Sequence, residues 1–370
     1  MRLRDCFNHY LIARDADIAD YYAQIAAAQP ADLLSIARTR DAEGTVPGEA
    51  RNVMYNIAAE IKNRFNEYGA PIPPLLEGCT VVDLCCGTGR DVYLAAQLVG
   101  ATGKVIGVEP NAERLAIAQK YLDKEMRQFG YAQSNVEFVC ACPEDLSMIE
   151  DNSVDVVMSN CTFNVSPDKE TYLAEVMRIL KEGGEFYFTD VFTDRRIPRS
   201  ISTNIARRAE HLGGALYIHD FRRLAQFTGF LDPRYLITNK TELTQAEQAA
   251  YPGIAFATIT CRLINSSAAE DICEAFGETI TYKGTLPDYP DYFLFDTTHK
   301  FPTGITCTVC SNVTACVGYE SRYAQVFDIT GCACPENHLG EIAGDTIIKT
   351  APAFDGVRDE DDIEVQASCC

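Results

Sequence analysis

The 370-residue sequence contains no tryptophan, few basic residues and no long run of apolar side chains. Lysine and arginine number 32 against 53 aspartates and glutamates, which gives a formal net charge of −21. Because positive charge dominates binding to phosphate backbones and anionic lipids, this balance argues against nucleic-acid and membrane partners. No apolar run reaches the ~18 residues that a membrane span needs. Charges interrupt the N-terminal stretch, so we expect no secretory signal and a protein of the cytoplasm or an organelle stroma.

The chain is more than twice the length of a typical ~150-residue domain, so we expect two or three domains. Hydrophobic residues make up 47% and charged residues 23%, which is typical of a globular protein. Sixteen cysteines are the compositional exception. Without a secretory signal they predict reduced thiols, most of them packed as small hydrophobes. Their clustering also fits contact with a soft metal or metalloid.

Strands and helices are expected to alternate from residue 80 onward, after an opening helix within residues 1–30 and a second helix over 52–65. The helix over 168–181 is expected to stop at Gly183 and Gly184. This rhythm predicts a doubly wound parallel sheet with right-handed crossovers. Its expected strands are 80–84, 104–109, 135–140, 154–160 and 185–191, completed by 235–238 and 257–264. We divide the chain into an N-terminal helical cap (1–75), a central domain (76–265), a small C-terminal domain (266–350) and an acidic tail (351–370).

The ends of four successive predicted strands carry residues suited to an adenosine ligand. Asp83 ends the first strand, and Gly87, Gly89 and Arg90 follow in a turn tight enough for a ligand to approach bare backbone. Glu109 comes 20 residues after Gly89, where a carboxylate takes the two ribose hydroxyls.

The next two strands add Glu144, which can accept from the adenine amino group, and Asn160 at the reactive end of the sheet. The third glycine of a dinucleotide fingerprint is missing, which disfavours a pyrophosphate and favours a phosphate-free adenosine ligand. S-adenosyl-L-methionine fits this description, with Asp83 near its charged methionine end.

Several longer motifs resemble the arsenite S-adenosylmethionine methyltransferase family. They are the segments Asp83–Asp91, Leu180–Val191 and Leu212–Tyr217, and the similarity extends from about residue 50 to beyond residue 330. The resemblance implies an α/β fold of the class I methyltransferase type: a Rossmann-like doubly wound sheet, a helical N-terminal cap and a smaller α+β C-terminal domain. It also implies S-adenosyl-L-methionine as the cofactor.

The residues on the acceptor side depart from this family's pattern. The family holds trivalent arsenic with thiolates, and Cys161, after the strand-four asparagine, keeps one of those positions. Tyr68 and His211 stand where two other thiols are expected, and a further cysteine is missing from the loop 39–50. We expect Tyr68, Cys161 and His211 to form the catalytic acceptor pocket. An imidazole can remove a proton, and a tyrosine ring can face a sulfonium through a cation–π contact.

The main prediction is therefore an S-adenosylmethionine-dependent methyltransferase that acts on a small soft nucleophile, a thiol or thioether sulfur. A first alternative is an arsenite or methylarsenite methyltransferase with a rearranged thiol set that draws on Cys307 and Cys310. A second is a non-catalytic sensor of the cofactor or of a metalloid. Cys307, Cys310, Cys332 and Cys334 could supply four thiolates to zinc or be buried thiols, and we assign no metal site.

Overall fold

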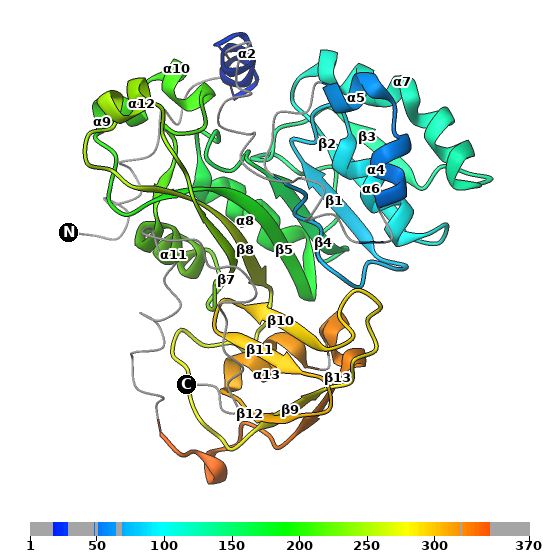
Figure 1. Ribbon diagram of the computed structural model, residues 1–370, viewed down its shortest axis with the longest axis vertical. Coiled ribbons are helices and arrows are strands. Elements are labelled where there is room, and N and C mark those ends of the chain that lie inside the picture. Colours follow the sequence, from blue (N-terminus) through cyan, green and yellow to red (C-terminus); the bar gives the residue numbers. More distant parts are fainter. Residues whose placement is uncertain (1–17, 29–47, 49–50, 64–68, 319, 341–370) are drawn as a thin grey trace.

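The computed structural model describes residues 18–28, 48, 51–63, 69–318 and 320–340 (Figure 1). Its centre is a sheet of strand order β3-β2-β1-β4-β5-β8-β7, with the short β6 paired to β5. The strands are β1 Thr80–Leu84, β2 Lys104–Val108, β3 Val136–Val139, β4 Val154–Asn160, β5 Leu180–Thr193, β6 Leu216–Tyr217, β7 Arg234–Lys240 and β8 Phe256–Ile264. The expected strands are therefore present, and β1 to β5 run parallel. The last strand, β8, runs antiparallel to both β5 and β7.

Helices cover both faces of this sheet, as its nearly continuous apolar strands require. One face packs residues of α4, α5, α6 and α7 against β1 and β2, and the other packs α8 and α11 against β4, β5 and β8. The helices are α2 Ile18–Ala28, α4 Arg51–Asn56, α5 Ala59–Asn63, α6 Arg90–Val99, α7 Ala112–Phe129, α8 Lys169–Ile179, α9 Arg199–Ser202, α10 Ile205–Ala209, α11 Ile218–Phe227 and α12 Gln245–Ala250.

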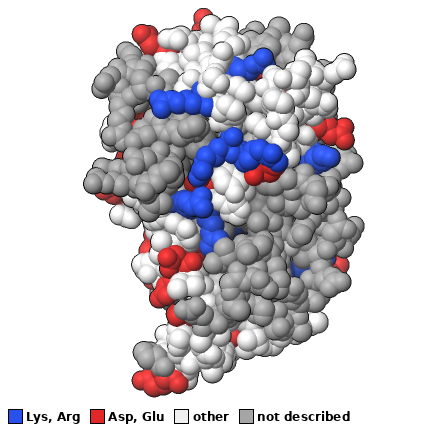
Figure 2. Space-filling model, turned by 90° about the vertical axis from the view of Figure 1, so that its left-hand side faces the viewer, with Lys and Arg blue, Asp and Glu red and all other residues white. Residues whose placement is uncertain are grey.

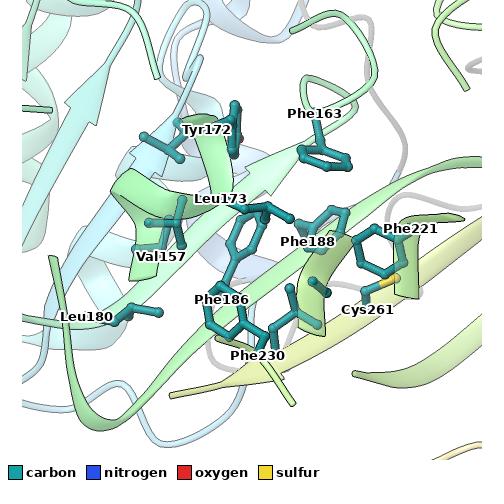
Figure 3. Packing of buried hydrophobic residues seen from close by; sticks show 14 of the residues in the cluster. Val157, Phe163, Tyr172, Leu173, Leu180, Phe186, Phe188, Phe221, Phe230 and Cys261 are labelled. Atoms are coloured by element: carbon teal, nitrogen blue, oxygen red, sulfur yellow. The ribbon is translucent and has the colours of Figure 1, made fainter. Parts of the chain in front are cut away.

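Aromatic side chains dominate the core on the α8 and α11 side (Figure 3). Phe186 and Phe188 of β5 stack with ring centroids 4.4 Å apart. Phe163, just after β4, meets Phe188 edge-to-face at 5.6 Å, and Phe221 of α11 meets Phe188 at 5.7 Å. Offset and edge-to-face contacts are the favoured geometries of aromatic pairs. This packing ties the segment that follows β4 to the centre of the sheet.

The predicted helix stop at Gly183 and Gly184 is wrong. Helix α8 ends at Ile179, and the chain is already extended at Leu180, so both glycines lie within β5. Gly183 has a φ of +74°, and a Cβ there would lie 2.1 Å from the carbonyl oxygen of Glu320. The glycine is required by this close approach of the C-terminal segment, which a local sequence pattern does not reveal.

The C-terminal part forms two small sheets and a helix with a core of their own (Figure 1). The junction with the main sheet lies around the buried Glu185 of β5, which accepts a hydrogen bond from Arg262 of β8 at 2.5 Å, while Arg262 also donates to the Phe295 carbonyl oxygen at 2.9 Å. Arg322 and Tyr323 also donate to the Glu185 carboxylate. The elements are β9 Thr279–Tyr282, β10 Tyr292–Asp296, β11 His299–Pro302, β12 Thr306–Thr308, α13 Ser311–Val317, η3 Arg322–Val326, β13 Phe327–Thr330 and η4 Pro335–Asn337. The domain boundaries at 75/76 and 265/266 stay predictions, and the expected tail lies outside the described residues.

Two surface properties bear on the expected partners. None of the described helices is long and apolar enough to cross a membrane. Lysine and arginine side chains form a band on one face (Figure 2). Some arginines of the chain are paired: Arg196 contacts Asp220 at 2.5 Å and Arg207 contacts Glu210 at 3.0 Å. Such ion pairs neutralise part of the positive charge.

Candidate methyltransferase site

The turn between β1 and α6 has the tight backbone that its sequence predicts. Gly87 and Gly89 both have positive φ angles, and so does Cys85, although it is not a glycine. A Cβ on Gly89 would lie 3.0 Å from the Cβ of Ala118 on α7, so the turn needs a glycine at this position. Asp83, within β1, is buried.

The Glu109 carboxylate joins the ends of β1 and β2. One carboxylate oxygen accepts a hydrogen bond from the Gly87 N–H and the other from the Asn111 N–H, each at 2.8 Å. Burial raises the pKa of Glu109, while Arg114 and the two N–H groups act in the opposite direction. Each oxygen has a second lone pair for a ligand hydroxyl. The geometry therefore fits the predicted ribose partner.

The Glu144 side chain has protein partners that the sequence did not indicate. It accepts from the Ser166 hydroxyl at 2.5 Å and from the Tyr22 hydroxyl of α2 at 3.1 Å. Burial raises its pKa to about 7, although Ser166, Tyr22 and Lys169 stabilise the charged form. The N-terminal helix α2 is thereby fastened to the end of β3, where the adenine is expected.

Asn160 and Arg90 meet at a residue that sequence reasoning passed over, Asp91. The Asn160 amide donates to Asp91 at 3.1 Å, and Arg90 donates to the other Asp91 oxygen at 2.7 Å. Both donors also reach the carbonyl oxygen of Gly69. Asp91 belongs to the motif that carries the family resemblance, so the signal for it was present. It orients two predicted cofactor residues from different elements.

Cys161 and His211 lie in contact although 50 positions separate them in the chain. The His211 Nδ1 atom is 2.7 Å from the carbonyl oxygen of Cys161. Because a carbonyl only accepts, Nδ1 carries the proton and Nε2 presents a lone pair. Burial lowers the pKa of His211 to about 4, so the ring is neutral at neutral pH. Both residues have left-handed backbones, with φ of 59° and 63°.

The loops that carry these two residues are held together at Asn164. Its amide and backbone N–H both donate to the buried Asp190 carboxylate of β5, at 2.6 and 2.9 Å. A Cβ on Gly214 would lie 2.0 Å from the Asn164 carbonyl oxygen. The Leu212–Tyr217 motif therefore supplies a close backbone contact that sets His211 against Cys161. The third predicted acceptor residue, Tyr68, lies outside the described residues.

Two more thiols lie near this end of the sheet. Cys85, after β1, packs against the core cluster that contains Val165, four residues after Cys161. Cys85 and Cys142 both pack against the cluster that contains Tyr21 and Tyr22 of α2. Burial raises the pKa of both thiols. These two cysteines therefore pack in a different core cluster from Cys307 and Cys310.

Cys307 and Cys310 do not take part in the rearranged thiol set that the sequence suggested. They belong to the C-terminal core, whereas Cys161 packs in another cluster with Val191 and Leu212. Within the described part of the chain, no three cysteine, histidine or acidic side chains are grouped as metal ligands. The zinc array considered from the sequence is thus not assembled there.

Known proteins share both the sequence and the fold. A methyltransferase-domain family model matches residues 75–229. The arsenite methyltransferase of Aquipseudomonas alcaligenes is 38% identical, covering 85% of this chain and 90% of that protein. The Homo sapiens arsenite methyltransferase is 33% identical and covers 96% of each chain. The crystal structure of the arsenic(III) S-adenosylmethionine methyltransferase of Chlamydomonas reinhardtii matches with a TM-score of 0.76 and 39% identity, covering 80% of this chain and 99% of that one.

These similarities confirm the class I methyltransferase fold and S-adenosyl-L-methionine as the cofactor. They extend through the central sheet and well beyond it, because the relatives are matched over most of their length. The protein is therefore an S-adenosylmethionine-dependent methyltransferase, and it belongs to the arsenite methyltransferase family.

Proposed function

We propose that this enzyme methylates trivalent arsenic, in a pocket at the end of β4 that contains Cys161 and His211. The observation that carries the proposal is its similarity to arsenite methyltransferases, 38% identity over 85% of the chain, together with Cys161 at the end of β4. Trivalent arsenic has a nucleophilic lone pair and prefers soft sulfur ligands. The buried Cys161 thiol can supply one such ligand.

In this proposal the cofactor is held by Asp83, Gly87, Gly89, Arg90, Glu109, Glu144 and Asn160. The fit rests on the buried Glu109 carboxylate, which is fixed 2.8 Å from the Gly87 N–H and keeps lone pairs for two hydroxyls. When bound, S-adenosylmethionine supplies an electrophilic methyl group on a sulfonium. Asp91 orients Arg90 and Asn160 beside it, and the buried site excludes water.

The acceptor side requires a different thiol set from that of the family. Cys161 is surrounded by apolar side chains, which keep water away. Cys85 is the second thiol of this set, because it follows β1, the neighbour of β4 in the sheet, and packs against the cluster that contains Val165 of the segment after Cys161. The neutral His211 takes the proton of an arsenic-bound hydroxyl or of an incoming thiol through Nε2. Positioning against the cofactor methyl then accounts for most of the rate.

A thiol or thioether sulfur is the second candidate acceptor, and His211 favours it. A neutral imidazole is a weaker ligand for trivalent arsenic than a thiolate but a suitable base for a thiol. The burial that lowers the pKa of His211 to about 4 keeps its ring unprotonated at neutral pH, although it also weakens the ring as a base.

The test is release of S-adenosylhomocysteine with arsenite, a small thiol or a thioether as the added acceptor. We expect turnover of arsenite and a large loss in Cys161→Ser. Cys332→Ser, which changes an exposed thiol outside the pocket, is the matched control. Equal arsenite turnover by wild type and Cys161→Ser contradicts the proposed pocket. Turnover of the thiol or thioether without arsenite turnover replaces the first candidate with the second.

A further inference from the structure

Outside the methyltransferase site, the C-terminal part contains two cysteines on facing segments. Cys273 lies in the connection between β8 and β9, and Cys310 directly precedes α13. Cys273 packs against the core cluster that contains Cys310, and Cys310 is near enough to raise the pKa of the Cys273 thiol. Cys310 is fully buried, whereas Cys273 is partly exposed. Cys273 is therefore the more accessible residue of the pair.

Backbone and amide hydrogen bonds fix the two segments against each other. The Ser311 N–H donates to the Glu274 carbonyl oxygen at 3.0 Å, which joins the residues next to the two cysteines. The Asn312 side chain accepts from the Glu270 N–H at 2.9 Å and donates to the Glu270 carbonyl at 2.8 Å. These hydrogen bonds fix the segments that carry Cys273 and Cys310 against each other.

The pair lies where the C-terminal part meets the edge strand of the main sheet. Arg234 of β7 is buried and pairs with Asp232 at 2.5 Å and with Asp296 of β10 at 2.9 Å. A third thiol, Cys316 of α13, contacts the same Asp232 carboxylate at 3.9 Å. Cys316 belongs to the same core cluster against which Cys273 packs, so it is an alternative partner and provides a stringent control.

We propose that Cys273 and Cys310 are a redox-active dithiol that closes to a disulfide when the protein meets a peroxide. The Cys273 sulfur attacks one peroxide oxygen, the O–O bond breaks, and a sulfenic acid and water form. The Cys310 sulfur then attacks the sulfenic sulfur, and the S–S bond forms as its hydroxyl leaves as a second water with the Cys310 proton. Two thiols are oxidised and one peroxide is reduced. The disulfide fastens the β8–β9 connection to α13.

The environment of the pair predicts slow oxidation. The neighbouring Cys310 thiol, followed by burial, raises the pKa of Cys273, and Arg234 opposes this shift only in part. The thiolate is the reactive form, so little of it is present at neutral pH. The pair consequently stays reduced in a thiol-reducing compartment and closes only under oxidant excess.

The test is peptide mapping of the full-length protein after treatment with hydrogen peroxide and then iodoacetamide. Trypsin yields Leu263–Lys283, in which Cys273 is the single cysteine, and Phe301–Arg322, which contains Cys307, Cys310 and Cys316. We expect the two peptides to be cross-linked, with the loss of two hydrogens, and to separate on addition of dithiothreitol. Circular dichroism of the oxidised sample verifies that the protein is still folded.

Variants identify the partner of Cys273. The cross-link should persist in Cys307→Ser and Cys316→Ser and be absent from Cys310→Ser. A cross-link that survives in Cys310→Ser assigns Cys273 to another partner and overturns the proposal. The proposal is also overturned if peroxide-treated wild-type protein is still folded and its peptide Leu263–Lys283 is recovered with Cys273 alkylated by iodoacetamide. The measurement does not depend on the acceptor of the methyltransferase, so the two proposals fail or hold separately.

Discussion

The residues that we assign to the cofactor and those that we assign to the acceptor are held in different ways. On the cofactor side, Glu109 binds the Gly87 backbone across two neighbouring strands, and both residues belong to short local motifs. On the acceptor side, Cys161 and His211 come from distant segments and meet through a side chain and a carbonyl oxygen. The cofactor side is thus a property of strand ends, whereas the acceptor side depends on how two loops pack.

This difference explains how one side can change while the other is kept. The N–H groups that hold Glu109 belong to the backbone, so they are present whatever side chains these positions carry. They therefore depend on the fold and place no requirement on the methyl acceptor. His211, in contrast, contacts the Cys161 carbonyl oxygen through its side-chain ring. A different residue at position 211 therefore changes the chemistry of the pocket without moving the sheet. Tyr68 and His211, at positions where the family resemblance leads us to expect thiols, beside an intact glycine turn, would follow this division.

Replacing His211 should give the largest effect and damage the acceptor side alone. If its imidazole is a general base, His211→Ala should lower kcat by roughly 10²–10⁴-fold, the range for such groups. The affinity for S-adenosylmethionine, measured by calorimetry, should stay unchanged. His219→Ala, on α11, is the control for loss of a histidine. A loss confined to KM would instead identify His211 as a binding group.

Replacing Glu109 should damage the cofactor side alone. Glu109→Ala removes an acceptor from the Gly87 N–H and from the ribose, so it should weaken S-adenosylmethionine binding by about 1.5–3 kcal/mol, the scale for hydrogen bonds to a charged group. Calorimetric titration measures the change, with Glu113→Ala at the exposed start of α7 as its control. Unchanged affinity in a folded Glu109→Ala protein would refute the ribose assignment.

The pH dependence of stability tests the link between α2 and the cofactor side. Burial raises the pKa of Glu144 from 4.5 to about 7, so the folded protein binds this proton more tightly than the unfolded chain. Its stabilising contribution is complete below pH 4.5 and is lost as the pH rises to about 7. Because proton binding is linked to folding, we expect the free energy of unfolding to fall by about 1–3 kcal/mol over this pH interval.

Denaturant unfolding of wild type and Glu144→Gln across these pH values isolates the contribution. The variant should show a smaller fall in unfolding free energy with rising pH, because glutamine does not titrate. The buried Asp190, whose pKa is also raised to about 7, is present in both proteins and cancels in the difference. Parallel curves for the two proteins would show that Glu144 does not titrate in this interval.

The smallest expected effect concerns Cys85, which connects the two sides. Its φ of 54° is costly for a residue with a side chain, by roughly 1–2 kcal/mol, and glycine avoids this cost. Glycine also loses more chain entropy on folding, so Cys85→Gly should stabilise the protein by only about 0.5–1 kcal/mol. Urea unfolding measures this change. The same variant should lower arsenite methylation, since it removes the proposed second thiol; a gain in both properties would exclude Cys85 from the thiol set.

The sequence alone was sufficient to predict the main sheet, because its signals are local. Buried β-branched runs such as Thr80–Leu84 and Val154–Asn160 coincide with β1 and β4. The glycines of the turn after β1 and the acid that ends β2 occur at fixed spacing, so strand pairing brings them together without further information. The cofactor and the family followed from these motifs, and the comparisons confirm both.

Only the tertiary structure decided the contacts between distant segments. It joined Tyr22 to Glu144 and His211 to the Cys161 carbonyl, and it required glycine at position 183 because the Glu320 backbone passes there. It also separated Cys307 and Cys310 from the pocket and brought Cys310 against Cys273. Such contacts depend on how whole elements pack, and a periodic pattern records which face of an element is buried but not which residue it meets.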